Sequence, residues 1–476
     1  MRVIAALFAA LVLAPTAFAG GPSMRVGASE DAVKRPTLVQ TKARLNLLRL
    51  AGLDSVRVTL TWAPGATAPA ADDADAIANL VDAAGLAGIK VYVSVSQFGS
   101  GTTPLTDEAR SQFADFAAAV AKRFPTLAGM IVGNEPNLNR FWLPQFNPDG
   151  SDAAAPAFLQ LLAQAYDAIK AVQPKLKVYG VGLSPRGNDN PTGIRLTHSP
   201  TTFLRDLGVA YRASGRTKPI MDGLALHPYQ DNSSQPPTFQ HPNSTSISIS
   251  DYDKLMALLA EAFDGTAQPG STVRLLYDEY GVESTIPASK AARYTGAEPA
   301  TTKPVDEATQ GAYYRQAISI AFCQPNVDGI LLFHAIDESG LPAWQSGVYY
   351  ADRTAKSSRA VVADAASQSR RGVIAVCPWL HVTPKVSALR WPQTLELRQR
   401  SASVAFTCNV DCTFDALLTR GSKLVTRKIG SAIGGSERAL PLRKRLASGT
   451  YVLRITFAAR VNAGGTVVRT KTVRVP

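Results

Sequence analysis

The stretch GMIVGNEPN at Gly129–Asn137 begins as a short apolar run and ends abruptly in a glycine, polar residues and a proline. A second stretch, VRLLYDEYG at Val273–Gly281, has the same plan and also carries a glutamate where its apolar run ends. Short apolar runs bounded by turn-forming residues are typical of buried strands. Because segments of helical period lie between such runs, the two stretches predict strands of a parallel α/β sheet.

Six further runs of this kind occur in the first 380 residues. The eight strand candidates are Met24–Ala28, Ser55–Thr61, Ile89–Ser94, Gly129–Gly133, Val178–Leu183, Gly223–Leu226, Val273–Tyr277 and Gly329–Phe333. Helical period marks segments between them, among them Thr41–Ala51, Asp72–Ala87, Glu108–Phe124, Ala154–Gln173 and Tyr252–Phe263. Eight such units predict a closed (β/α)₈ TIM barrel over residues 20–380. A dinucleotide-binding fold is disfavoured because the first strand lacks a Gly-rich phosphate turn.

The pattern changes after Pro378. Short alternating runs separated by turn residues replace the helical period: Val386–Leu389, Leu395–Arg398, Ser403–Thr407, Thr413–Leu418, Leu424–Ile429, Tyr451–Ala458 and Val467–Val475. This pattern predicts a small all-β sandwich, similar to immunoglobulin or fibronectin domains, over residues 381–476.

The amino terminus has the plan of a secretory signal peptide. Arg2 precedes the apolar run Val3–Leu13, and Ala17–Ala19 offers a small-x-small cleavage site. We therefore expect a signal peptide over residues 1–19 and a secreted or extracellular protein, with cell-wall association as a further option. No later run reaches the length of a transmembrane helix.

The four cysteines suit an exported protein. Cys323 and Cys377 are candidates for one disulfide near the end of the barrel, and Cys408 and Cys412 for a second, in a tight loop. A metal site is the alternative, but the spacing fits no zinc pattern. We accordingly expect no metal and no cofactor.

Positive charge is concentrated in the C-terminal domain. Residues 381–476 hold 17 Lys and Arg against 4 Asp and Glu, a net charge of +13, and the whole chain holds 50 against 37, also +13. The first 380 residues are therefore balanced. This asymmetry suggests an anionic partner such as a cell-envelope polymer, and a merely solvated basic face is the alternative. Nucleic acid is disfavoured because aromatic residues are sparse in this domain and the protein is expected outside the cell.

Strand parity indicates which polar side chains enter the barrel. Arg57 alternates with apolar residues that should face the helices, so it is expected to point inward, where it needs an anionic partner. On the sixth strand His227 and Tyr229 share a face with small residues. On the seventh, parity places Glu279 inward and Asp278 on the opposite face.

Two carboxylates at facing strand ends suit glycosidic-bond hydrolysis, and Glu135 and Glu279 are candidates for such a pair. The chain resembles clan A of the glycoside hydrolases, the cellulase-like retaining β-glycosidases on (β/α)₈ barrels. The resemblance covers about residues 24–370. It rests on Asn134-Glu135-Pro136, Glu279-Tyr280-Gly281, Arg57 with Trp62, His227-x-Tyr229, and Gln345-Ser346-Gly347-Val348-Tyr349.

The resemblance implies a role for each matching residue. Glu135 would act as general acid and then base, and Glu279 as the nucleophile of a double displacement. Asn134 would bind the 2-hydroxyl of the sugar, and Arg57 and Tyr229 would hold Glu279 ionised. The further substrate-binding candidates are Trp62, His227, His334 and Trp344.

The chain departs from the pattern at two positions. Many members carry a histidine after the third strand, where this chain has Ser94–Gln97, and many carry a tryptophan after the eighth, where it has Phe333-His334. The sugar is therefore left open. A non-catalytic carbohydrate-binding protein on a barrel scaffold and an envelope-associated protein that acts through its basic domain are the alternatives.

Overall fold

The structure is a computed structural model that describes residues 20–374, 386–390, 402–408, 412–432, 437–443, 445–459 and 466–475. The predicted signal peptide lies outside these residues. Within them, no helix is both long enough and apolar enough to cross a membrane.

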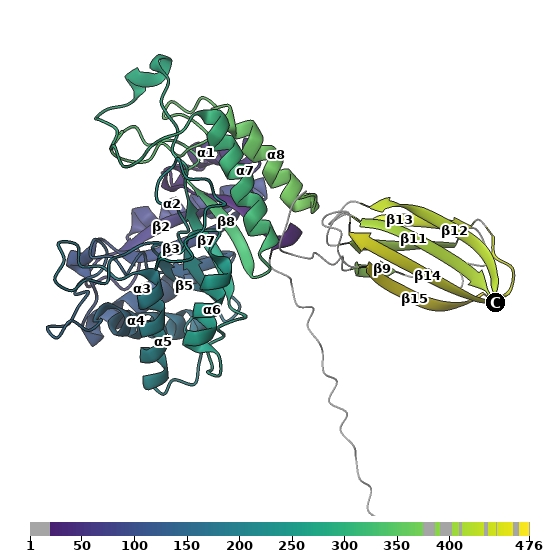
Figure 1. Ribbon diagram of the computed structural model, residues 1–476, viewed down its shortest axis with the longest axis horizontal. Helices are drawn as coiled ribbons and strands as arrows, with labels where there is room; N and C mark the ends of the chain where they lie inside the picture. The colour runs from purple at the N-terminus through teal and green to yellow at the C-terminus, as the bar shows by residue number, and fades with distance from the viewer. Residues whose placement is uncertain are drawn as a thin grey trace, which may run out of the picture.

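Eight parallel strands close into a barrel in the order β1 to β8, with β8 paired to β1, and helices surround them (Figure 1). The strands are β1 (Arg25–Ser29), β2 (Ser55–Trp62), β3 (Lys90–Gln97), β4 (Gly129–Val132), β5 (Val178–Leu183), β6 (Gly223–Leu226), β7 (Arg274–Tyr280) and β8 (Val327–Phe333). The prediction of a TIM barrel is confirmed, and each predicted strand overlaps an observed one.

One long helix follows each strand. These helices are α1 (Leu38–Leu50), α2 (Ala71–Ala87), α3 (Asp107–Arg123), α4 (Ala154–Val172), α5 (Pro200–Ala213), α6 (Tyr252–Phe263), α7 (Glu307–Cys323) and α8 (Ser358–Arg371). Short 3₁₀ turns lie at η1 (Gly21–Ser23), η2 (Asp31–Val33), η3 (Ser100–Thr102) and η4 (Ala288–Arg293). Side-chain caps start several helices, as where Thr106 accepts a hydrogen bond from the amide of Ala109 at α3.

The barrel has two apolar layers. The larger lies between strands and helices and includes residues of every strand. The smaller fills the lower barrel interior with Tyr92, Ile131, Tyr179, Ala225 and Leu276. At the lower end, the Tyr179 hydroxyl donates to Asp328 Oδ2 (2.6 Å). This floor leaves the upper interior, at the carboxyl ends of the strands, free for polar side chains.

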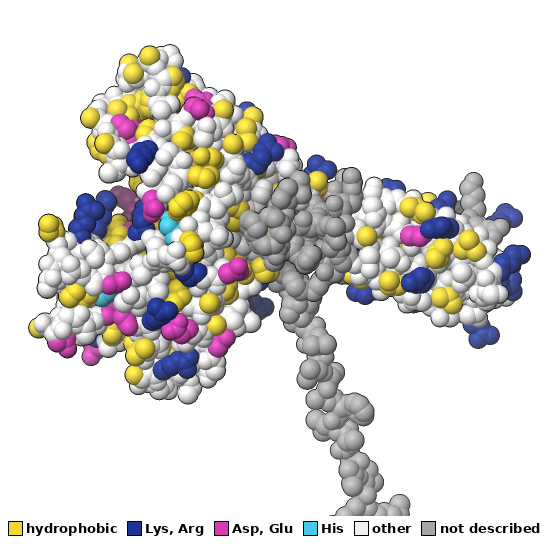
Figure 2. Space-filling model, in the orientation of Figure 1, with side chains coloured by type: hydrophobic (Ala, Val, Ile, Leu, Met, Phe, Trp, Pro, Cys, Tyr) yellow, Lys and Arg dark blue, Asp and Glu magenta, His cyan; other side chains and the backbone are white. Residues whose placement is uncertain are grey.

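The C-terminal part forms two antiparallel sheets around a core of its own, as predicted. One sheet has the order β13 (Arg438–Arg443), β10 (Ala402–Cys408), β9 (Val386–Arg390), and the other β12 (Lys423–Ala432), β11 (Cys412–Arg420), β14 (Gly449–Ala459), β15 (Thr466–Val475). Strand β13 was not predicted, and the predicted strand Leu395–Arg398 lies outside the described residues. Lys and Arg side chains recur over these sheets (Figure 2).

The disulfide between Cys408 and Cys412 is present and joins the ends of β10 and β11. Both cysteines are fully buried in the core of the sandwich. The other predicted pair has one member, Cys377, outside the described residues. Cys323 itself ends helix α7 and is buried.

Candidate active site

Both glutamates lie at the carboxyl end of the barrel. Glu135 is in the turn that follows β4, and Glu279 is the penultimate residue of β7. His227 follows β6 directly, and Arg57 is the third residue of β2. The structure therefore brings together residues that are far apart in the sequence, at the end of the barrel where active sites of this fold are built.

His227 connects the two glutamates. Its ring is fully buried, and Nδ1 lies within hydrogen-bond distance of Glu135 Oε1, at 2.9 Å. The same nitrogen lies 3.5 Å from Glu279 Oε2. One imidazole N–H therefore faces both carboxylates, so that it can stabilise negative charge on either of them.

Arg57 and Tyr229 hold Glu279 from two sides. Arg57 Nη1 donates to Glu279 Oε1 (2.7 Å), and the Tyr229 hydroxyl donates to Oε2 (3.0 Å). The guanidinium is itself positioned by two hydroxyls, because Nη1 also donates to Ser29 Oγ (2.8 Å) and Nη2 to Ser94 Oγ (3.1 Å). The inward direction predicted for Arg57 and its anionic partner are both found.

The electrostatics favour a cationic Arg57 and His227. Burial alone would lower the pKa of each group, but the negative charges of Glu279 and Asp278 outweigh it. The pKa of Arg57 is raised, and that of His227 is raised well above its ordinary value. Burial, followed by the charges of Glu279 and Glu135, raises the pKa of Tyr229, which keeps its hydroxyl a neutral donor.

The orientation predicted for Asp278 is wrong. Leu276 lies in the barrel interior, and Leu275 and Tyr277 face the helices, so Asp278 points inward as well. It lies 3.6 Å from Arg57 Nε and 3.5 Å from His227 Nε2. Glu279 still reaches the site because the pairing of β7 with β8 shifts register between Tyr277 and Tyr280. Such a bulge re-aims side chains, and strict alternation does not anticipate it.

A strained turn presents Glu135. Its φ is 45°, in the left-handed region that non-glycine residues avoid at a cost of about 1–2 kcal/mol. The amide of Glu135 donates to Gly182 O (2.7 Å), at a bulge in β5 where Val181 and Gly182 also have positive φ. The bulge of β5 thus fixes the backbone of Glu135, and Asn134 precedes it in the same turn, half-buried.

Aromatic side chains border the site beside Glu279. The Trp344 ring stacks on Tyr229 with centroids 5.0 Å apart and packs edge-on against Phe333. His334 is half-buried, with its Nδ1 2.7 Å from Ser29 O and its Nε2 4.0 Å from Glu338 Oε2. Trp344 therefore lies at the rim beside Tyr229, and His334 lies at the rim near Arg57.

Trp62 does not reach this site, which corrects its place among the substrate-binding candidates. Its ring is buried between β2 and the helices, edge-on to Phe113 of α3. Its indole N–H donates to Ala66 O (2.9 Å). The reason is parity, because Trp62 shares a face of β2 with Val58 and Leu60 and not with Arg57.

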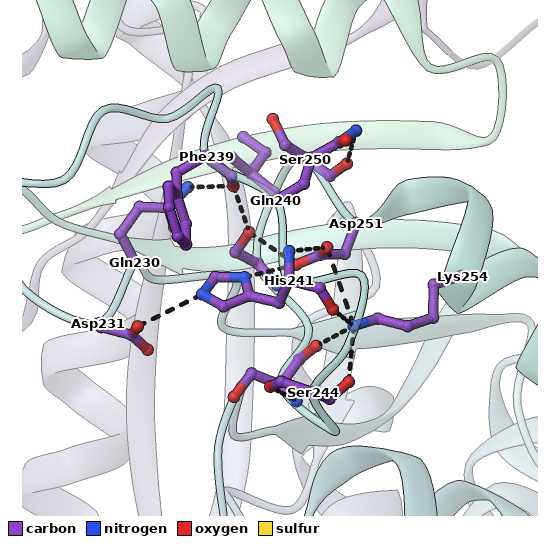
Figure 3. Close-up of polar contacts among 12 residues, drawn as sticks. Gln230, Asp231, Phe239, Gln240, His241, Ser244, Ser250, Asp251 and Lys254 are labelled. Carbon is purple, nitrogen blue, oxygen red and sulfur yellow. Dashed lines mark hydrogen bonds and ion pairs between the residues drawn. The ribbon is translucent and has the colours of Figure 1, made fainter.

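Hydrogen bonds and ion pairs among its own residues stabilise the insertion between β6 and α6 (Figure 3). His241 is buried within it, with Nδ1 2.8 Å from Asp251 Oδ2 and Nε2 3.4 Å from Asp231 Oδ2. Ser248 donates to the same Asp251 oxygen from its hydroxyl (2.9 Å). Lys254 Nζ donates to the carbonyl of His241 (2.7 Å). These contacts fix the segment that follows Tyr229.

Sequence reasoning missed four residues around the glutamates: Ser29, Ser94, Arg186 and the inward-facing Asp278. On β3, Ser94 lies two residues after Tyr92, which is in the barrel interior, so strand alternation could have found it. Arg186 follows β5 and donates to Gln230 O (2.7 Å), and its pKa is lowered by burial. Among the described residues no cluster of three or more His, Cys, Asp or Glu side chains has the arrangement of a metal site.

Neither a family model nor a curated protein matches this chain. Among solved structures, it is similar to a calcium-binding mutant of β-glucuronidase 2 from Bacteroides uniformis, with 12% identity, a TM-score of 0.46, and coverage of 95% of this chain but only 45% of that one. A GH5_18 protein from Streptomyces cattleya in complex with GlcNAc has 19% identity and a TM-score of 0.49, with coverage of 74% and 81%. Exo-β-1,4-mannosidase Op5Man5 from Opitutaceae bacterium strain TAV5 has 18% identity and a TM-score of 0.45, with coverage of 74% and 61%. At these values the likenesses carry no inference about activity.

Proposed function

We propose that this protein is a secreted retaining glycoside hydrolase that cleaves O-glycosidic bonds of a polysaccharide or oligosaccharide. The observation that carries the proposal is the pair of glutamates on one imidazole nitrogen. Glu135 Oε1 and Glu279 Oε2 lie 2.9 and 3.5 Å from His227 Nδ1, so the two oxygens are at most 6.4 Å apart (2.9 plus 3.5 Å). Retaining enzymes hold their carboxyl groups about 5–5.5 Å apart, and inverting enzymes roughly 6.5–9.5 Å.

The two glutamates differ in the way that a double displacement requires. Glu279 accepts hydrogen bonds from Arg57 and Tyr229, which fix the direction of its carboxylate. It would attack the anomeric carbon. Glu135 would protonate the leaving oxygen and then remove a proton from the water that releases the glycosyl group.

The rim supplies surfaces for a sugar. Asn134, in the turn with Glu135, is the candidate for a hydrogen bond to a hydroxyl, and the half-buried Trp344 presents an aromatic face beside Tyr229. His334 lies on the same side.

A trapping experiment tests the proposal. The protein is incubated with a panel of activated 2-fluoro glycosides, and the labelled residue is mapped by mass spectrometry. We expect a stable adduct on Glu279, none in Glu279→Gln, and retained anomeric configuration of the first product by NMR. The Glu261→Gln variant is a suitable control, because Glu261 forms an exposed ion pair with Arg205 far from the site. The absence of an adduct from the whole panel, with glycan binding unaltered in Glu279→Gln, would favour the carbohydrate-binding alternative.

Secretion is supported by the N-terminal pattern and by the Cys408–Cys412 disulfide, which is stable in an oxidising compartment. In a secreting host, the mature protein should begin at Gly20. Full-length protein retained in the cytosol would contradict this part of the proposal.

An anionic cell-envelope polymer is the proposed partner of the C-terminal domain. Lys423, Arg427, Lys428 and Arg474 are exposed on β12 and β15, within a segment of net charge +13. Replacing Lys423, Lys428 and Arg474 by Gln in the full chain should weaken retention on anionic cell-wall material at low salt. Equal retention of the variant and the parent protein would leave the basic residues as solvated surface.

A further inference from the structure

Four buried atoms at the site lack a hydrogen-bond partner, and they face one another in two pairs. They are Arg57 Nε, His227 Nε2 and both carboxylate oxygens of Asp278. Arg57 Nε lies 3.6 Å from Asp278 Oδ2, and His227 Nε2 lies 3.5 Å from Asp278 Oδ1. Both distances are a few tenths of an ångström beyond a hydrogen bond but within ion-pair range. Each oxygen of Asp278 therefore faces one cationic group.

A second buried aspartate inside the same barrel shows a different arrangement. Asp328, at the lower end, accepts hydrogen bonds from Tyr179 (2.6 Å), Lys177 (3.0 Å) and Arg274 (3.1 Å). Asp328 thus ties three strands together. Among the described residues, the Asp278 carboxylate accepts no hydrogen bond, and its ion pairs are with Arg57 and His227, the two cationic groups that face the glutamates. This arrangement suits an effect on their charge better than a structural tie between strands.

We propose that Asp278 is a positioning residue, the counterion that pairs with Arg57 and keeps His227 cationic next to the catalytic pair. This inference rests on the proposed function and deepens it. Asp278 does not touch the substrate; it acts through His227, whose opposite nitrogen faces Glu135 and Glu279.

The charges balance before and after the first chemical step. The double displacement requires Glu135 to carry a proton at the start, so that two cations, Arg57 and His227, then face two anions, Asp278 and Glu279. As Glu279 forms its bond to the anomeric carbon it loses its charge, the bond to the leaving oxygen breaks, and the proton of Glu135 passes to that oxygen. Negative charge thus moves from Glu279 to Glu135, and the Nδ1–H of His227 is placed to donate to both.

The surroundings of His227 agree with this role. The groups that face its ring are Asp278 and Glu279 of β7, Glu135 after β4, and Tyr229 of its own segment. Arg57 is the neighbouring cation, held by the same two acids of β7. Asp278 is among the causes that raise the pKa of His227 well above its ordinary value.

The direct test follows the ring nitrogens of His227 by NMR in full-length protein labelled with ¹⁵N-histidine. The His227→Gln variant assigns the signal among the five histidines. We expect the wild-type ring to stay doubly protonated well above the pH of about 6.5 near which an ordinary histidine titrates. In Asp278→Asn the titration should move down by about one pH unit or more. Asp328→Asn, the same change at the other end of the barrel, should leave the titration of His227 unchanged.

The kinetic test uses whichever activated glycoside the panel identifies. In Asp278→Asn, kcat should fall about 10- to 100-fold with a smaller change in KM. The alkaline limb of the pH–activity profile should also shift to lower pH than in the wild-type protein. Asp278→Glu, which keeps the charge, should recover part of that loss.

Two results would overturn the inference. One is an unchanged His227 titration in Asp278→Asn, even if activity falls. The other is a wild-type His227 that titrates at or below about 6.5, which needs no variant and so does not depend on the folding of Asp278→Asn. A shifted titration in a protein that turns over no glycoside would sustain the counterion role and reject the hydrolase assignment.

Discussion

Replacing Arg57 by methionine tests the buried charge cluster on which the site depends. Arg57 is 3% exposed and contacts the carboxylates of Asp278 and Glu279, which are 0% and 9% exposed. Methionine fills similar space but removes one of the two cations that face these buried carboxylates and leaves only His227. Removing one partner of a buried ion pair costs about 3–5 kcal/mol of unfolding free energy, because an uncompensated charge is left behind.

This loss converts into a measurable change of melting temperature. Unfolding entropy is about 2.1 cal/mol/K per residue, or roughly 0.7 kcal/mol/K for a barrel of about 350 residues. Arg57→Met should therefore lower the melting temperature of the barrel by about 4–7 °C, measured by calorimetry at pH 7.

The matched control is Arg205→Met. Arg205 pairs with Glu261 at 3.0 Å, but both side chains are about half exposed, at 49% and 55%. Such a surface pair contributes at most about 1 kcal/mol, which corresponds to roughly 1 °C here. If Arg57→Met melts within 1 °C of Arg205→Met, the cluster does not hold Arg57 in the way described.

Three further predictions concern other parts of the chain. Replacing Cys408 and Cys412 by serine should cost the sandwich about 2 kcal/mol, because the bridge closes a loop of about five residues, and the barrel transition in the same calorimetric scan should not move. Burial raises the pKa of Glu283 from 4.5 to about 8, so the folded state binds this proton more tightly than the unfolded state does. The free energy of unfolding should therefore fall as pH rises from about 4.5 to 8. In Glu283→Gln this dependence on pH should be weaker, and an equal dependence in both proteins would contradict the prediction. Tyr229→Phe removes a hydrogen bond to Glu279 and should lower kcat about 10- to 100-fold while the melting temperature changes little, and unchanged kinetics would remove Tyr229 from the site.

Much of the site could be predicted from the local sequence pattern, because along most barrel strands the side chains alternate between the barrel interior and the surrounding helices. The apolar residues around Arg57 on β2 correctly indicated that it points inward, and the small residues before His227 did the same for β6. The same rule, applied to Trp62, would have placed that ring against the helices, where it is found. The family resemblance overrode parity at this position.

Parity failed on β7 because it assumes an uninterrupted strand. The register of β7 with β8 shifts between Tyr277 and Tyr280, so Asp278 and Glu279, which are adjacent in sequence, both contact Arg57. Strand β13 was missed for a related reason, because Pro441 interrupts a short run that pairs only with β10 at the edge of its sheet.

The sequence alone determined the order of eight strand and helix units, the change to an all-β domain, and the two glutamates that follow β4 and β7. Short-range patterns of apolar and turn-forming residues indicate these features, and such patterns can be recognised without knowledge of tertiary contacts. Only the tertiary structure decided that one nitrogen of His227 faces both glutamates and that Asp278 lies against both Arg57 and His227. Those contacts depend on the closure of the barrel and on bulges in β5 and β7, where backbone pairing between distant segments sets the direction of each side chain.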